Sequence, residues 1–332
     1  MNKFTNTIGI DVSKKTLDVR DHVHQLVLQV NNNAAGFKEL FLWTKKSNAD
    51  LSAVLFCFEH TGMYSLPLAV YLSEHQQPYS MVPGLEIKRS LGISRGKNDP
   101  ADAQAIARYA YLRRDEIKTY HLPSKQLLEL KSLLSLREKM VSQRAGYQAS
   151  KKEMKSFLKV VKMSSVLFEA QEQMIKELDK QILKVEKQLV EIINNDEQLK
   201  KTFNLVTSVK GVGLVLGTTM LVYTNCFTAF DDWRKFACYS GIVPFEYQSG
   251  ISIKGKKKIS HLANKRIKAL LSNAACTSIQ HNPEMKIYYE RRIKEGKNKM
   301  STQNIIRNKI VARIFAVVKR GSEYVDTFKY AA

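Results

Sequence analysis

The chain has 332 residues and a formal net charge of +22, from 53 lysine and arginine side chains against 31 aspartate and glutamate side chains. This length suits two or three domains, and so large a positive excess indicates a polyanionic partner, for which nucleic acid is the default. The sequence has no apolar run of membrane-spanning length and no cysteine spacing typical of zinc sites or disulfides, so we expect a cytoplasmic protein without membrane contact.

The charge is unevenly distributed along the chain. Residues 1–122 carry 15 basic and 12 acidic side chains, whereas residues 250–320 carry 18 basic and 3 acidic ones. We expect three domains: a catalytic domain over 1–122, a helical linker over 123–200 and a basic domain over 201–332. The back of the chain is expected to hold the nucleic acid.

The first predicted element is a strand that carries an aspartate. The stretch 7–14 alternates isoleucine and valine with glycine, Asp11 and serine, which is typical of a strand with one apolar face. Asp11 is therefore expected to point away from that face. Stretches 16–20 and 25–30 predict two more strands, in an antiparallel meander that opens a mixed sheet. A carboxylate on a central strand is costly unless a base or a metal ion lies beside it.

Three more acids follow at the ends of predicted elements. Residues 53–58 form a continuous apolar run, typical of a strand covered on both faces, and Glu59 stands at its end. Asp99, a proline and then Asp102 predict a helix N-terminus with Asp99 as N-cap, and this pair alone can be a simple cap. Together with Asp11, however, these acids would repel one another unless divalent cations lay among them. Such ligands suit Mg²⁺ or Mn²⁺, and paired ions of this kind cleave phosphodiesters.

The middle of the chain predicts two long helices. From residue 126 to residue 193 there is no proline, and Gly146 is the only glycine. Apolar residues recur there at near-heptad spacing between faces dense in lysine, glutamate and glutamine. We expect either an antiparallel helix pair or a dimer-forming coiled coil.

The C-terminal portion contains several candidate nucleic-acid contacts. Lys210, Gly211 and Gly213 lie between two helical patterns, where the backbone can approach a phosphate closely, although a plain tight turn explains the glycines equally well. Residues 251–260 predict a small β hairpin. The other basic residues expected to contact nucleic acid are Lys254, Lys256, Lys257, Lys258, Lys265, Arg266, Arg291 and Arg292.

Three motifs give the sequence a specific resemblance. The stretches 8–14, 59–64 and 97–103, which contain the four acids, are similar to the successive motifs of the DEDD-type insertion-sequence transposases. The N-terminal domain of that family is similar to the Holliday-junction resolvase RuvC. The resemblance implies a ribonuclease-H-like α/β domain, a coiled-coil linker and a mainly α-helical C-terminal domain. Asn98 stands where the family often has threonine, a change that leaves the carboxylates in place.

The resemblance also implies a serine nucleophile. In the family, a tyrosine-alanine-glycine-leucine/valine-proline motif is followed shortly by serine-glycine, and that serine attacks the DNA. Ser249 matches this serine, and Ser240, which stands where the family usually has alanine, is its rival. Taken alone, a serine before glycine is normally a turn residue. No histidine has triad spacing to Ser249, so metal-bound carboxylates are expected to activate it.

The function implied by the resemblance is DNA recombination. Such an enzyme excises and inserts its own mobile element through a serine-phosphate intermediate, guided by a structured bridge RNA, and acts on donor and target DNA as a dimer or tetramer. Three alternatives remain open. They are a RuvC-like nuclease or junction resolvase that hydrolyses DNA with water, an actin-like kinase that uses residues 8–11 as a phosphate-loop strand, and a non-catalytic nucleic-acid binder.

Overall fold

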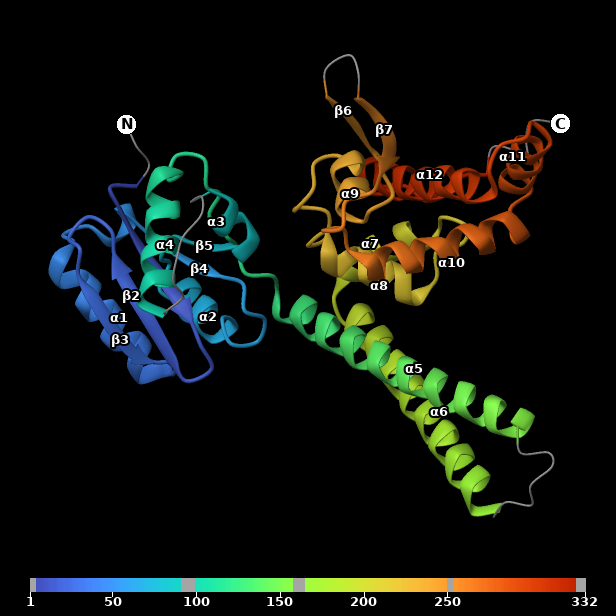
Figure 1. Cartoon of the computed structure of the whole chain (residues 1–332), viewed down its shortest axis with the longest axis horizontal. Helices are drawn as coiled ribbons and strands as arrows, with labels where there is room; N and C mark the ends of the chain where they lie inside the picture. Colours follow the sequence, from blue (N-terminus) through green and yellow to red (C-terminus); the bar gives the residue numbers. More distant parts are fainter. Residues whose placement is uncertain (1–3, 91–98, 158–164, 250–252, 327–332) are drawn as a thin grey trace. The chain divides into compact units, whose positions relative to one another are not determined.

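The computed structural model describes residues 4–90, 99–157, 165–249 and 253–326 (Figure 1). The chain forms two compact units, Met1–Leu122 and Pro123–Ala332. The boundary falls just before a proline, at the start of the long helical part of the chain. In the described ranges, no helix is both long and apolar enough to span a bilayer.

The first unit is built on a five-stranded mixed sheet. β1 pairs antiparallel with β2 and parallel with β4, β2 pairs antiparallel with β3, and β4 pairs parallel with β5. The predicted meander and mixed sheet are therefore confirmed. In spatial order the strands are β3 (Val27–Asn31), β2 (Thr16–Asp21), β1 (Asn6–Val12), β4 (Val54–Glu59) and β5 (Tyr79–Val82).

Helices cover both faces of this sheet. One face packs against α1 and α2 in a core that includes Ile10 and Phe58, and the other packs against α3 and α4 in a smaller core that includes Cys57 and Ile106. Because side chains alternate along a strand, Asp11 lies on the α4 face, away from the larger core. The helices of this unit are α1 (Ala34–Ser47), the 3-10 turn η1 (Leu51–Ala53), α2 (Leu66–Glu74), α3 (Gly84–Ser90) and α4 (Asp99–Leu112).

Two long helices of the second unit, α5 (Lys125–Phe157) and α6 (Ser165–Asn194), lie side by side (Figure 1). Ion pairs between them advance by seven residues along α5 while their partners retreat by seven along α6. The helices are therefore antiparallel and share a heptad repeat. Of the two arrangements left open by the sequence, the chain forms the antiparallel pair. The ion pairs join Arg137 to Glu186 (2.7 Å), Arg144 to Asp179 (2.5 Å) and Lys151 to Glu172 (2.7 Å).

The rest of the second unit is mostly helical. Its core includes Phe236, Leu271 and Ile310, all at most 1% exposed, and the near ends of α5 and α6 pack against α7 and α8 through Leu130 and Leu189. The helices are α7 (Glu197–Thr207), α8 (Leu214–Tyr223), α9 (Trp233–Tyr239), α10 (Lys265–His281), α11 (Pro283–Lys294) and α12 (Lys299–Arg320).

The hairpin predicted within residues 251–260 is wrong. A single strand forms there, β7 (Ile253–Lys258), and its antiparallel partner is the preceding β6 (Phe245–Ser249). Gly255 does not reverse the chain but pairs with Tyr247 inside the ladder. Aromatic residues, which β6 contains, favour strands more than lysine does. This preference explains why β7 pairs with β6 and not with another part of the lysine-rich segment.

Candidate functional site

Asp11 and Glu59 occupy neighbouring positions on the two central strands. The last register pair between the parallel strands β1 and β4 joins Ile10 to Phe58. The acid is the next residue on each strand, so Asp11 and Glu59 lie level on strands about 5 Å apart and on the same face of the sheet. Both are partly buried. The end of these strands therefore presents two carboxylates to the helix that covers this face.

α4 crosses that face in close contact with Gly9. A Cβ at residue 9 would lie 2.2 Å from the backbone nitrogen of Ala107 and 2.4 Å from the carbonyl oxygen of Ala103. The Thr7 hydroxyl donates to the Ala107 carbonyl at 2.9 Å. From Thr7 to Gly9 the contacts on α4 thus move toward lower residue numbers. The helix therefore runs antiparallel to β1.

If this register continues along the strand, the first turn of α4 is expected near Asp11. Asp11 lies two residues beyond Gly9, about 7 Å along the strand, a distance spanned by about four to five residues of helix. Counting back from Ala103 and Ala107 reaches the turn that begins at Asp99 and contains Asp102. Asp102 is partly buried. The side chain of Asp99 lies outside the described residues.

The carboxylate of Glu59 is seated against Gly84, the first residue of α3. A Cβ at residue 84 would lie 1.8 Å from Oε1 of Glu59 and 2.8 Å from its Oε2. Any larger residue there would have to displace the carboxylate. The missing side chain at Gly84 therefore determines where the acidic group of Glu59 lies.

A hydrogen bond ties α3 to α4 beside these acids. The Tyr109 hydroxyl donates to Oε1 of Glu86 at 2.6 Å. Burial and the neighbouring Glu86 carboxylate raise the pKa of Tyr109 above its ordinary value, so the tyrosine remains a donor. The contact fixes the helix that carries Gly84 against the helix that carries Asp102.

Asp18 on β2 is an acid that the sequence analysis missed. It is the register partner of Asp11, it is 6% exposed, and its Oδ1 accepts a hydrogen bond from Nε2 of Gln29 at 2.8 Å. The alternation of residues 16–20 already separates Asp18 from its apolar neighbours. The signal that was lacking is the pairing register, which brings it opposite Asp11.

The donor set fits a hard divalent cation by its chemistry. In the parts of the chain that the structure describes, no three histidine, cysteine, aspartate or glutamate residues form a group that could hold a metal ion. Asp11, Glu59 and Asp102 are among the described residues, so these three do not form such a group by themselves, and the side chain of the fourth predicted ligand, Asp99, lies outside the described residues. All four offer carboxylate oxygens, the ligands preferred by Mg²⁺ and Mn²⁺.

The two candidate serines differ in their surroundings. Ser240 is fully buried at the C-terminus of α9, where its hydroxyl donates to the carbonyl of Ala237 at 3.1 Å. Ser249 is the last residue of β6 and pairs with Ile253, while its side chain lies outside the described residues. Because the Ser240 hydroxyl is fully buried, it could reach a phosphate only if the surrounding structure opened locally.

Lys210 and its neighbouring glycines form the turn between α7 and α8. Gly211, with φ of +93°, packs so closely on α10 that a Cβ would lie 2.2 Å from Oγ of Ser278. Gly213 precedes α8, and a Cβ there would have nothing within 4 Å. Lys210 Nζ lies 2.6 Å from Oδ2 of Asp326. Packing thus accounts for Gly211, and Gly213 remains open to a ligand.

The other predicted basic contacts are placed in different settings. Arg266 lies 3.0 Å from Oε2 of Glu138 and also donates to the Leu134 carbonyl, so it is engaged with α5. Arg291 and Arg292 both pair with Glu295 (3.7 and 3.0 Å). Lys265 is exposed. The side chains of Lys254, Lys256, Lys257 and Lys258 lie outside the described residues.

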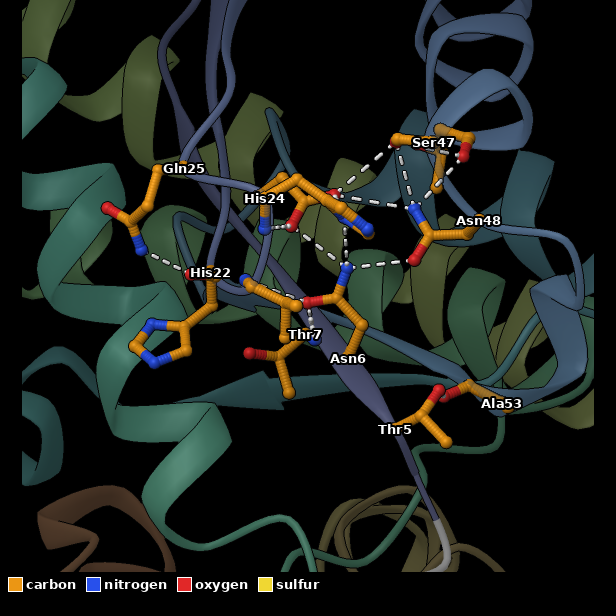
Figure 2. A network of polar contacts seen from close by, with 12 residues as sticks. Thr5, Asn6, Thr7, His22, His24, Gln25, Ser47, Asn48 and Ala53 are labelled. Carbon is orange, nitrogen blue, oxygen red and sulfur yellow. Dashed lines mark hydrogen bonds and ion pairs between the residues drawn. The ribbon is translucent and has the colours of Figure 1, made fainter.

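A separate polar network, which includes Asn6, His24 and Asn48 (Figure 2), surrounds Asp21. Asp21 pairs with Ile8, toward the opposite end of β1 from Asp11. The Asp21 side chain is fully buried and accepts hydrogen bonds from Asn6 Nδ2 (2.9 Å), the His24 backbone nitrogen (2.9 Å) and Asn48 Nδ2 (3.3 Å). Burial acts to raise the pKa of Asp21, but the hydrogen bonds from His24, Asn6 and Asn48 outweigh it and lower the pKa. The network joins β1 and β2 to the end of α1.

Comparison with known proteins gives two family matches. Residues 8–163 match an IS110-type DEDD model described as a transposase, and residues 203–290 match a model described as the transposase IS116/IS110/IS902 family. Three relatives show how far the likeness extends. The chain is 27% identical over 327 residues to the pilin gene-inverting protein of Moraxella bovis, covering 96% of this chain and 97% of that protein.

The protein of the same name from Moraxella lacunata gives the same identity and coverage, 27% over 327 residues. An uncharacterized 43.6 kDa protein of insertion element IS110 from Streptomyces coelicolor is 28% identical over 122 residues, which is 36% of this chain and 29% of that protein. The likeness to the Moraxella proteins therefore extends over almost the whole of both chains.

Proposed function

This chain belongs to the IS110 family of transposases, and from that premise we propose that it cuts and rejoins DNA by metal-dependent phosphoryl transfer. The observation that carries the proposal is the level placement of Asp11 and Glu59 on adjacent parallel strands, on the face of the sheet that α4 covers. The ends of two strands and one helix N-terminus supply acids to one face of the sheet.

The carboxylates of Asp11, Glu59, Asp99 and Asp102 are the proposed metal ligands. Mg²⁺ or Mn²⁺ bound by them would supply positive charge to the attacking and leaving oxygens of a phosphodiester. The protein's own contribution is positional. Gly84 leaves room for the Glu59 carboxylate, and Gly9 lets α4 approach β1 closely enough to bring Asp102 to the same edge.

Ser249 is the proposed nucleophile. Its Oγ forms a bond to the scissile phosphorus while the bond from phosphorus to one deoxyribose oxygen breaks. The serine proton passes to a carboxylate or water, and the leaving oxygen takes up a proton to become a hydroxyl. Attack on the serine phosphate by a hydroxyl of another DNA strand frees the serine again. The number of phosphodiester bonds is conserved, so the cycle requires no nucleotide cofactor.

Two observations support rejoining over simple hydrolysis. The relatives that match nearly the whole chain are named for inverting a gene, a change that requires cut ends to be joined again. The rival serine, Ser240, is fully buried and its hydroxyl already donates to a backbone carbonyl, which favours Ser249 over Ser240 as the serine that holds the cut end.

A guide RNA and a homo-oligomer complete the proposal. The density of positive charge over residues 250–320, 18 basic against 3 acidic side chains, is enough for RNA as well as donor and target DNA. Exposed apolar side chains on α6, at Val166, Leu183 and Val190, support contact with a second copy in a dimer or tetramer.

Serine variants test the proposal directly. The purified chain, the RNA that co-purifies with it and DNA carrying the element's ends are incubated with Mg²⁺, and covalent protein–DNA adducts and exchanged strands are measured. We expect Ser249→Ala to abolish both products and Ser240→Ala to retain them. Undiminished cleavage and exchange by Ser249→Ala would reject the serine intermediate, and cleavage without exchange would favour a water-dependent nuclease.

A further inference from the structure

Arg307 is a buried charge that no carboxylate neutralises within the described residues. It lies on α12 and is 5% exposed. Among the residues that the structure describes, its guanidinium donates only to two neutral amides, Oδ1 of Asn304 and Oε1 of Gln303, both at 3.2 Å, and its Nε has no hydrogen-bond partner. Since a guanidinium stays charged at any physiological pH, such burial is costly. Burial also lowers the pKa of Arg307, an effect that the Cys276 thiol opposes.

Two other partly buried arginines of this unit form ion pairs with acids. Arg313, on the same helix, donates to both carboxylate oxygens of Glu284, at 2.6 and 2.8 Å. Arg266 pairs with Glu138 at 3.0 Å. Arg313 and Arg266 thus each pair with an acid. No acid of the described residues pairs with Arg307, which is more deeply buried than either.

Arg307 lines a groove of about 730 Å³ whose charged lining is entirely basic. Lys265 and Lys268 of α10 contribute ammonium groups and Ser301 contributes a hydroxyl, whereas the Ser272 hydroxyl already donates to the Lys268 carbonyl at 2.7 Å. Lys265 and Ser301 belong to the first turns of α10 and α12, so the positive ends of two helix dipoles meet at the groove. These donors and charges together are suited to an anion with several oxygen acceptors.

The same stretch of α12 holds the segment that leads into β6. Nδ2 of Asn304 and Nδ2 of Asn308 both donate to the carbonyl of Ile242, at 2.7 and 3.1 Å. Pro244, just before β6, also lines the groove. An anion bound beside Arg307 would therefore lie next to the start of the strand that ends at Ser249.

We propose that this groove binds a backbone phosphate of a nucleic acid, with the Arg307 guanidinium as its buried ligand and Lys265 and Lys268 at its mouth. The identity of the polyanion rests on the proposed function. The ligand chemistry is a phosphodiester, which either DNA or a guide RNA supplies. The phosphate oxygens would accept the hydrogen bonds that the neutral surroundings of Arg307 leave unmade.

Binding and stability measured together on Arg307→Met test this site. The full chain is titrated with a short random-sequence duplex DNA and with a single-stranded RNA of the same length, over a series of salt concentrations. We expect Arg307→Met to bind the probe that occupies the groove about tenfold more weakly than the wild type does, because the variant loses one charged contact. The slope of log K against log salt should shrink by about 0.9 for duplex or about 0.7 for single strands.

The melting temperature separates a ligand role from a structural one. Without nucleic acid, Arg307→Met should melt at or above the wild-type temperature, because the variant removes a buried charge that no carboxylate of the described residues neutralises. Lys319→Met, which removes an exposed charge from the same helix, is the matched control and should bind both probes nearly as the wild type does. The probe that alone loses affinity identifies the source of the phosphate.

Two results would overturn the inference. One is an Arg307→Met variant that binds both probes as Lys319→Met does. The other is a double variant, Lys265→Gln with Lys268→Gln, that binds both probes as the wild type does. This second result decides the question if Arg307→Met fails to fold. Failure of the wild-type chain to cut and exchange strands in the serine assay would refute the proposed function and leave these binding results standing.

Discussion

Glu59 and Gly84 fit together so closely that a Cβ on the glycine would lie 1.8 Å from Oε1 of the glutamate. Glu59 ends β4, and Gly84 begins α3 immediately after β5 and the intervening proline. Gly84, which has no side chain, thus sets the position of a candidate metal ligand. The remaining acids depend on a second glycine, Gly9, which determines how closely α4 approaches the sheet.

The first prediction concerns Gly84→Ala. The added methyl group should push the Glu59 carboxylate aside and lower DNA cleavage by about 10- to 100-fold, the usual effect of disturbing the support of a metal ligand. Stability should change by less than about 1 kcal/mol, because the end of a glutamate side chain moves easily and alanine suits a helix. Cleavage assays and urea unfolding measure the two effects. Full activity in a folded variant would remove Gly84 from the site.

Gly9→Ala should act on the fold itself. Its Cβ would meet backbone atoms of α4, at 2.2 Å from the Ala107 nitrogen, and backbone cannot swing away as a side chain does. We expect a loss of at least about 1–3 kcal/mol in the free energy of unfolding of the first unit. Gly146→Ala, with nothing within 4 Å of the new Cβ, is the control and should be neutral or stabilising. Equal stability of both variants would contradict the packing of α4 on β1.

The central ion pair of the antiparallel helices gives a test of their register. Arg144→Glu should destabilise the chain, and the added change Asp179→Arg should restore part of the loss, because the two groups lie 2.5 Å apart. Both side chains are partly exposed, so the coupling energy should be only about 0.2–1 kcal/mol. A double-mutant cycle by thermal unfolding measures it. Zero coupling would argue against this register.

Acid titration of stability tests the network around Asp21. The folded pKa of Asp21 lies below its ordinary value of 3.8, so the folded state binds this proton less tightly than the unfolded state does. The stabilisation is therefore complete above that value and is lost as the pH falls from it through the lower folded pKa. Asp21→Asn should be less stable at neutral pH, and its deficit should shrink across this window. A deficit that stays constant down to the lowest pH would contradict the lowered pKa.

Much of the first unit could be read from local patterns. The alternation around Asp11 predicted its strand and face, and the apolar run before Glu59 predicted a buried strand, because one-residue periodicity reports burial directly. The pairing register is different. It depends on contacts between distant residues, so the sequence did not reveal that Asp18 faces Asp11 across β1 and β2.

The second unit shows the same limit. The heptad pattern predicted both long helices, but only their pairing shows that Arg144 meets Asp179 in the same chain. A hairpin was predicted within residues 251–260, yet the single strand that forms there pairs with β6 and not with a neighbouring part of the lysine-rich segment. Arg307 gave no local signal at all, because its burial and the absence of an acidic partner in the described part of the chain arise from how α12 packs.

The acids at this edge of the sheet should bind divalent cations, and calorimetric titration of the full chain with Mn²⁺ measures that binding. The variants are Asp11→Asn and Glu59→Gln, with Asp115→Asn, an exposed acid of the same unit, as the matched control. We expect the wild type and the control to bind Mn²⁺ alike and both site variants to lose that binding while they remain folded. Binding of Mn²⁺ by Asp11→Asn and Glu59→Gln with wild-type affinity would contradict the account.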